Sequence, residues 1–252
     1  MKSSSLKMHA LVVVLCLAAC SHNNDFKKAS PKVTAATNMQ LAIEYMKLGR
    51  LAQSRDFMEL ALKGDPENPD VQITAGIVYE RLNDMPKAER AYSTAYRLGK
   101  DDPNIQNNYA GFLCRTGKAV AGEKLFADVA RNPLYQTPEV ALVNAGVCVR
   151  NTGDVVDAER YFNKALAIRP NLPEAMVQLG NIAFDRGDTA QAREIVQRYL
   201  AVNAPTPEVL WLGVRAERKL GNTTGAAAYA RRVQTEFPDS EQAQKMRSGV
   251  DR

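Results

Sequence analysis

Histidine is almost missing from this chain of 252 residues. Its two copies, His9 and His22, both lie near the N-terminus. The remainder therefore cannot form a Ser–His–Asp triad, a Cys–His pair or a histidine-rich metal site. It also has no glycine–lysine phosphate loop and no GxGxxG motif after a strand. We expect no catalytic site, metal, cofactor or small-molecule substrate, and a hydrolase built on paired carboxylates is the one enzymatic alternative left open.

Aromatic residues and blocks of positive charge are also scarce. The chain has seven Phe and one Trp but abundant alanine, a composition that favours closely packed helices over sheets. The net charge is +5, and Lys2 and Lys7, which contribute two of these charges, lie in a segment that we expect to be removed. The remaining positive charge forms no basic block, so we expect no binding of nucleic acid.

The N-terminus has the organisation of a leader peptide over residues 1–19. Lys2 and Lys7 precede an apolar run, residues 10–17, that is too short to span a bilayer. The run ends in Leu-Ala-Ala-Cys, which resembles the lipobox of bacterial lipoproteins, with cleavage before Cys20 and lipid on its sulfur. An ordinary cleavage site with a chance cysteine is the alternative.

The lipobox resemblance also implies a destination. Such proteins carry about three acyl chains, enough for stable anchoring. Ser21 rather than Asp follows the cysteine, which implies the periplasmic face of the outer membrane. Residues 20–34 are polar, contain Pro31 and lack an apolar period, so we expect a lipidated N-terminus and a flexible tether.

Residues 138–171 combine two apolar-periodic runs with a turn at residues 152–154. Gly146 lies in the first run, Gly153 in the turn, and Ala158 and Phe162 in the second run, which is followed by Pro170. This order of small and large residues is typical of a tetratricopeptide repeat, a helix–turn–helix unit of about 34 residues.

The same pattern recurs along residues 35–252. Six copies are predicted at residues 35–68, 69–102, 103–136, 139–172, 173–206 and 207–240, with two extra residues before the fourth and a polar capping helix over about 239–247. No single unit can bury its own apolar face, so stacked units share one continuous core. We predict an all-α, right-handed tetratricopeptide solenoid.

Cys114 and Cys148 would be the only internal cysteines after processing. They lie in the predicted first helices of the third and fourth repeats, which run side by side. The oxidising periplasm favours a disulfide between them, which would stabilise the fold by about 3–4 kcal/mol in the chain-entropy model. Two buried thiols that never approach within bonding distance are the alternative.

The concave side of such a solenoid is lined by its first helices and commonly receives a peptide or helix. We predict partner contacts there from Asn107, Asn108, Arg115, Asn144, Arg150 and Asn181. The alternative is that these asparagines only satisfy neighbouring helices. A second candidate surface is the methionine-rich first repeat, with Met39, Ile43, Met46, Met58 and Leu62, although core packing would account for about half of them.

The strings NNYAGFLC (residues 107–114) and NPLYQTPEVALVNAGVC (residues 132–148), with the lipobox and six repeats, resemble the type IV pilus biogenesis/stability proteins called PilW or PilF. The resemblance implies an outer-membrane lipoprotein, a pilotin, that binds secretin subunits and promotes their localisation and multimerisation for type IV pili. A periplasmic adaptor for peptidoglycan enzymes or for outer-membrane protein assembly is the alternative.

Overall fold

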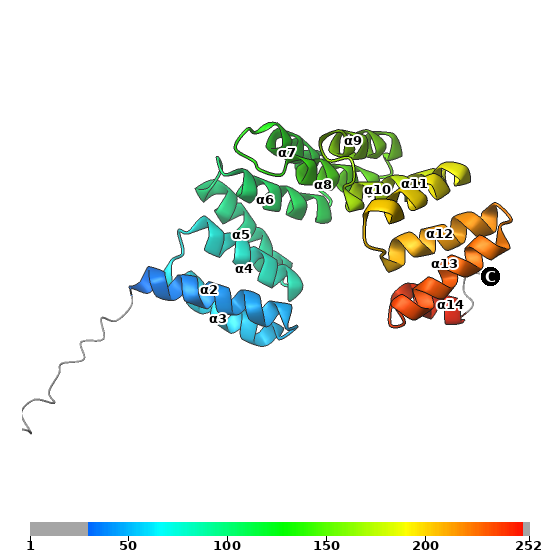
Figure 1. Ribbon diagram of the computed structural model, residues 1–252. Helices are drawn as coiled ribbons and strands as arrows, with labels where there is room; N and C mark the ends of the chain where they lie inside the picture. Colours follow the sequence, from blue (N-terminus) through cyan, green and yellow to red (C-terminus); the bar gives the residue numbers. More distant parts are fainter. Residues whose placement is uncertain (1–29, 249–252) are drawn as a thin grey trace, which may run out of the picture.

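The computed structural model describes residues 30–248, a part of the chain that is helical throughout, without a strand. Six antiparallel helical hairpins follow one another and end in one shorter helix, and together they form an arch (Figure 1). The hairpins are α2 (Pro31–Lys47) with α3 (Leu51–Gly64), α4 (Pro69–Arg81) with α5 (Met85–Leu98), α6 (Pro103–Arg115) with α7 (Ala119–Arg131), α8 (Pro138–Arg150) with α9 (Val155–Ile168), α10 (Pro173–Asp185) with α11 (Thr189–Val202), and α12 (Pro207–Lys219) with α13 (Thr223–Glu236); the last helix is α14 (Glu241–Ser248). The predicted all-helical repeat solenoid is confirmed.

Local sequence explains where the helices begin and turn. Each first helix of a hairpin begins with proline, whose missing N–H would have no partner at that position. Several second helices are capped by a carboxylate, as where Asp154 accepts from the backbone N–H of Asp157. The turns within the hairpins use one residue with positive φ, which is Gly49, Asn83, Gly117, Gly153, Gly187 or Gly221. These six residues keep the repeats in register.

The first repeat begins earlier than predicted. Proline is tolerated in a first helical turn, so Pro31 starts α2, and the hydroxyl of Ser30 accepts from the backbone N–H of Val33. The predicted tether is therefore wrong over residues 31–34, which are helical. The leader peptide and Cys20 lie outside the described residues.

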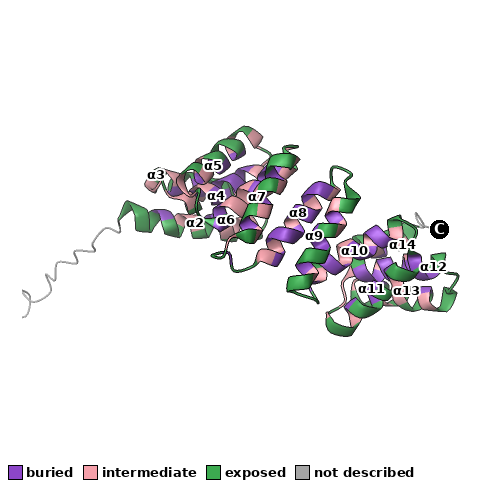
Figure 2. Cartoon of the chain, turned by 90° about the horizontal axis from the view of Figure 1, so that it is seen from above, coloured by how far each residue is buried: buried purple, intermediate pink, exposed green. Residues whose placement is uncertain are grey.

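Each hairpin closes where a small residue faces a large one. A Cβ on Gly76 would lie 2.8 Å from the ring of Tyr92, and one on Gly146 would lie 2.6 Å from the ring of Phe162. Both rings are buried. Figure 2 shows the buried positions where neighbouring helices face each other and the exposed positions on the outer surfaces. The paired helices can thus approach closely because Gly76 and Gly146 have no side chain.

The sixth repeat keeps this device but shifts it by one residue. Val214 occupies the position equivalent to Gly180, and Gly213 instead faces the ring of Tyr229, 2.9 Å from where its Cβ would lie. The position equivalent to Phe162 in this repeat is Ala230, so the repeat period places no aromatic ring there. The structure shows that Tyr229 takes over the packing role.

The third and fourth repeats are joined covalently. Cys114 on α6 and Cys148 on α8 form a disulfide, with their Cα atoms 5.5 Å apart, which confirms the predicted pairing. The loop between α7 and α8 adds a separate apolar contact, where Tyr135 packs against Val129 and Ala141. This seam is therefore fixed by both a covalent bond and an apolar anchor.

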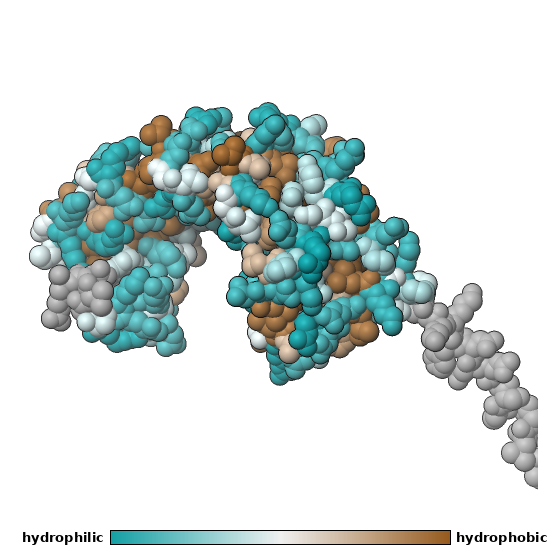
Figure 3. All heavy atoms as spheres, turned by 180° about the vertical axis from the view of Figure 1, so that it is seen from behind, coloured by the Kyte–Doolittle hydropathy of each residue, from teal (hydrophilic) through white to brown (hydrophobic). Residues whose placement is uncertain are grey.

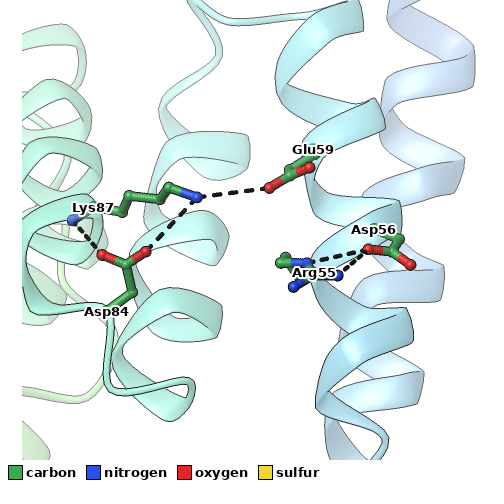
Figure 4. Close-up of polar contacts among 5 residues, drawn as sticks. All are labelled: Arg55, Asp56, Glu59, Asp84 and Lys87. Atoms are coloured by element: carbon green, nitrogen blue, oxygen red, sulfur yellow. Dashed lines mark hydrogen bonds and ion pairs between the residues drawn. The ribbon is translucent and has the colours of Figure 1, made fainter.

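Exposed ion pairs lie on and between helices α3 and α5. Lys87 on α5 reaches Glu59 on α3 at 3.8 Å and Asp84 at 3.7 Å, and Arg55 pairs with its neighbour Asp56 at 2.9 Å (Figure 4). All of these side chains are substantially exposed, and exposed pairs contribute little to stability. No helix between residues 30 and 248 is long and apolar enough to cross a bilayer.

Candidate partner-binding groove

The inner side of the arch holds a concave pocket of about 800 Å³. Its walls come from the first helices α4, α6 and α8, with the Cys114–Cys148 disulfide in the lining and the rings of Tyr92 and Phe126 contributed from the second helices. Seen from behind, the molecule is hollowed between its two ends (Figure 3). The groove therefore lies on the face that the repeat pattern predicts.

Four of the six predicted groove residues line this pocket: Asn107, Asn108, Arg115 and Asn144. The side-chain amide of Asn144 donates to Oδ1 of Asn107 at 3.3 Å, which links α8 to α6. Asn108 donates to the backbone oxygen of Asn104 on its own helix at 2.8 Å. Each amide makes one of the several hydrogen bonds it can form, so donors and acceptors remain for a partner.

The other two predicted residues lie outside this pocket. Arg150 donates to Gln178 at 2.6 Å and pairs with Asp185 at 3.3 Å, both on α10. Asn181 donates to the backbone oxygen of Val177 at 3.0 Å. Arg150 thus bridges neighbouring repeats, while Asn181 turns back onto its own helix.

Glu80 and Arg115 form a two-point ion pair in the groove. Nε of Arg115 lies 2.5 Å from Oε1 of Glu80, Nη2 lies 2.9 Å from Oε2, and the hydroxyl of Tyr92 donates to the same Oε2 at 2.9 Å. Burial raises the pKa of Glu80, but hydrogen bonds from Arg115 and Tyr92 outweigh it, so the pKa lies below its ordinary value. Burial and Glu80 both raise the pKa of Tyr92, which keeps the phenol protonated.

From α4 to α12, each first helix is linked to the next one by an ion pair or by the disulfide. Glu80–Arg115 joins α4 to α6, the disulfide joins α6 to α8, and Arg150–Asp185 joins α8 to α10. Between α10 and α12, Arg215 lies 3.6 Å from Asp185. The sequence analysis missed Glu80 and Asp185; opposite charges separated by 35 residues, one more than the period, were the available signal.

The first-repeat surface is partly corrected. Met58 is fully buried, so it packs the core and offers no surface to a partner. Met39, Met46 and Leu62 are partly buried and pack against the same core cluster. Ile43 is also partly buried, at the register position equivalent to Ile77, which lines the pocket. Among residues 30–248, no three His, Cys, Asp or Glu side chains gather in a way that could hold a metal ion.

Comparison with known proteins identifies the fold and the family. Sequence models of the tetratricopeptide repeat match residues 39–103, 152–216 and 209–240. The crystal structure of PilW, described as a widely conserved type IV pilus biogenesis factor, is 30% identical and has a TM-score of 0.72. The match covers 84% of this chain and 97% of that one. The chain belongs to the PilW family.

A second protein, PilF, is similar to this chain in sequence and in fold. The type IV pilus assembly protein PilF of Pseudomonas aeruginosa is 20% identical over 83% of each chain. A solved structure of Pseudomonas aeruginosa PilF superposes with a TM-score of 0.68 at 19% identity, covering 88% of this chain and all of that one. The cellulose synthase operon protein C of Xanthomonas axonopodis pv. citri is 23% identical, but only 14% of its length is matched, so the likeness is to a short part of that protein.

Proposed function

We propose that this member of the PilW family is an outer-membrane lipoprotein pilotin that binds secretin subunits and promotes their localisation and multimerisation for type IV pilus biogenesis. The observation that carries the proposal is the likeness to PilW over nearly the whole length of both chains. The lipobox-like sequence ending in Cys20 supports the membrane anchor, and the open groove beside the disulfide supports a binding role.

The proposed mechanism separates transport from recognition. Acyl chains on Cys20 would hold the N-terminus at the membrane, since more than one chain is needed for stable anchoring. The solenoid would hold a secretin subunit in its groove, where the links between α4, α6 and α8 fix the helix spacing before the partner arrives. A groove that needs no ordering on binding saves the entropy that a flexible surface would lose.

The anchor is tested by Cys20→Ala in the full-length protein, with Cys16→Ala as the matched control because Cys16 lies inside the leader. Cys20→Ala should give an unprocessed precursor and a mislocalised secretin multimer, and Cys16→Ala should behave as wild type. Normal processing of the Cys20→Ala protein, or an unchanged outer-membrane multimer, would overturn the lipoprotein pilotin proposal.

The partner is tested by affinity purification from detergent-solubilised membranes. Secretin in the purified complex is the expected result. A peptidoglycan synthase, a hydrolase or a barrel-assembly component in its place would identify an envelope adaptor instead.

A further inference from the structure

The loops that follow the third, fourth and fifth repeats are almost uncharged. They are residues 132–137, 169–172 and 203–206. Arg169 is their only charged residue, and it lies 3.7 Å from Glu139 near the start of α8. The two earlier loops, residues 65–68 and 99–102, hold four acidic side chains. The chemistry of the loops therefore changes after the third repeat.

Each of the three uncharged loops is accompanied by an exposed aliphatic side chain. Leu134 lies in the first loop, while Ile168 and Val202 end α9 and α11, directly before the other two loops. Their exposed fractions are 73%, 52% and 53%. Single exposed apolar residues are normal on a protein surface. Here three of them lie at successive loops, and Ile168 and Val202 occupy equivalent positions 34 residues apart.

The three loops lie side by side along one edge of the arch. Antiparallel hairpins place every loop between repeats at the end where the first helices begin. The side-chain amide of Asn203 donates to the backbone oxygen of Asn171 at 3.3 Å, which joins the second and third loops. The Arg169–Glu139 pair joins the second loop to the helix that follows the first. The apolar edge is defined by Leu134, Ile168 and Val202.

A basic side chain lies one helical turn behind two of these aliphatic residues. Lys164 precedes Ile168 on α9, and Arg198 precedes Val202 on α11, by four residues in each case. Residues four apart share a helix face, and both cations are exposed. An aliphatic tip with a cation behind it matches a phospholipid surface, where acyl chains lie beneath a layer of phosphates.

The apolar edge carries little net charge. Glu174 and Glu208 are exposed in the first turns of α10 and α12, at the same end of the helices as the loops. They balance Lys164 and Arg198, and Arg169 is already paired. Aliphatic contacts rather than charge would therefore hold this edge to a surface, and added salt should change the contact little.

The described chain begins at the same end of the helices. Because α2 is a first helix, Ser30 before it lies at the end where the loops between repeats lie. Cys20, the proposed site of lipid attachment, precedes Ser30 by ten residues, which limits their separation to about 36 Å. A connection this short gives a high effective concentration of the edge at the bilayer, so weak contacts can suffice.

We propose that the apolar edge rests on the phospholipid surface of the membrane that holds the anchor, with its aliphatic side chains at the acyl chains and Lys164 and Arg198 at the phosphates. This inference rests on the proposed function for the lipid on Cys20. The contact fixes the direction in which the groove faces, since an arch held only by its tether could rotate. A fluid lipid surface fits side chains that protrude from separate loops, whereas a protein partner would need a matching shape.

Tryptophan quenching by brominated lipids tests the contact. The full-length lipoprotein is reconstituted into vesicles of phosphatidylethanolamine and phosphatidylglycerol with bromine on the upper acyl chains. The edge variants are Leu134→Trp, Ile168→Trp and Val202→Trp. The control variants are Val120→Trp and Val156→Trp, which are exposed apolar positions at the opposite end of the helices. The native Trp211 gives the same background in every variant.

The fluorescence added by each edge tryptophan should fall about twofold or more, because an interfacial contact reaches the upper acyl chains. The fluorescence added at the control positions should not change. Equal quenching at the edge and control positions would overturn the inference, and so would the absence of quenching at both.

A pair of triple variants separates a lipid surface from a protein partner. Leu134→Ser/Ile168→Ser/Val202→Ser removes the apolar edge. Val120→Ser/Val156→Ser/Leu220→Ser removes the same number of exposed aliphatic side chains from the opposite end of the helices. Both should retain secretin as the wild type does. Loss of secretin from the edge variant alone, with unquenched edge tryptophans, would assign the edge to a protein and overturn the inference.

The inference and the proposed function can fail separately. If the protein floats with the vesicles and retains secretin while its edge tryptophans are not quenched, the membrane contact is wrong and the pilotin function stands. If the edge tryptophans are quenched but no secretin is retained, the membrane contact stands and the partner assignment is wrong. A protein that does not float with the vesicles has no anchor, and both proposals are then wrong.

Discussion

Gly122 on α7 lies directly against the disulfide sulfur of Cys114 on α6, and a Cβ on Gly122 would collide with that sulfur. The equivalent position in neighbouring repeats is alanine, as in Ala88 and Ala158, which are fully buried. Glycine costs about 1 kcal/mol relative to alanine inside a helix. The third repeat thus gives up helix propensity to make room for the disulfide.

This relationship predicts that Gly122→Ala is more destabilising when the disulfide is present than when it is absent. In the oxidised protein the added methyl group should cost about 1–3 kcal/mol through overpacking. In a Cys114→Ala/Cys148→Ala background the cost should fall by at least about 1 kcal/mol, although the backbone oxygen of Ala110 also lies close. Urea unfolding of the four proteins measures the coupling, and additive effects would contradict it.

The Glu80–Arg115 pair predicts a pH-dependent contribution to stability. Because the pKa of Glu80 is lower in the folded protein than its ordinary value of 4.5, the pair stabilises the fold above about pH 4.5. That contribution is lost as the pH falls through the folded-state pKa. Glu80→Gln should therefore lower the free energy of unfolding by about 1–2 kcal/mol at pH 7, and the difference from wild type should shrink below pH 4.5.

The matched control is Glu89→Gln, which breaks the exposed Lys118–Glu89 pair. Both partners are more than half exposed, so the change in the free energy of unfolding should be too small to resolve at either pH. Equal losses in the two variants would show that burial and the contact with Tyr92 add nothing to the groove pair.

The shifted pair in the sixth repeat predicts that Tyr229, not Ala230, carries the packing of α13 onto α12. Tyr229→Ala should cost about 3 kcal/mol, within the range for removing a large ring from a packed site. Gly213→Ala should cost about 1–3 kcal/mol because its Cβ would lie 2.9 Å from the Tyr229 ring. Combining the two should recover part of the Gly213→Ala cost in thermal unfolding, and full additivity would contradict the contact.

The repeat pattern and the structure agree where a local rule decides the outcome. Proline at helix starts and glycine in turns are backbone requirements, so the hairpins lie where their period puts them. Ser30 and Pro31 form a start signal of the same kind, which the polar composition around them concealed. The repeat period did not predict the role of Tyr229, because Gly213 on α12 and Tyr229 on α13 each lie one residue before the template position. Since both residues are shifted in the same direction, the contact between them is kept.

The groove was less predictable because each of its polar side chains can form hydrogen bonds or ion pairs with several different neighbours. The repeat register places Asn107 and Arg150 on the same face, but only the structure shows that Arg150 reaches across to Asp185. Such contacts depend on how far consecutive helices are rotated, which the period alone does not specify.

The turn residues Asn83 and Gly153 predict a graded response to alanine. Asn83 has φ 59°, within the left-handed region that asparagine tolerates, whereas Gly153 has φ 91°. Nothing lies within 4 Å of a Cβ on Gly153, so substitution there meets only a conformational cost. Gly153→Ala should therefore cost about 1–2 kcal/mol and Asn83→Ala about 1 kcal/mol, while Asn83→Gly should change stability by less than about 0.5 kcal/mol. Urea unfolding at neutral pH checks all three, and a larger loss for Asn83→Gly than for Gly153→Ala would show that the asparagine side chain, rather than backbone conformation, holds the turn of the second repeat.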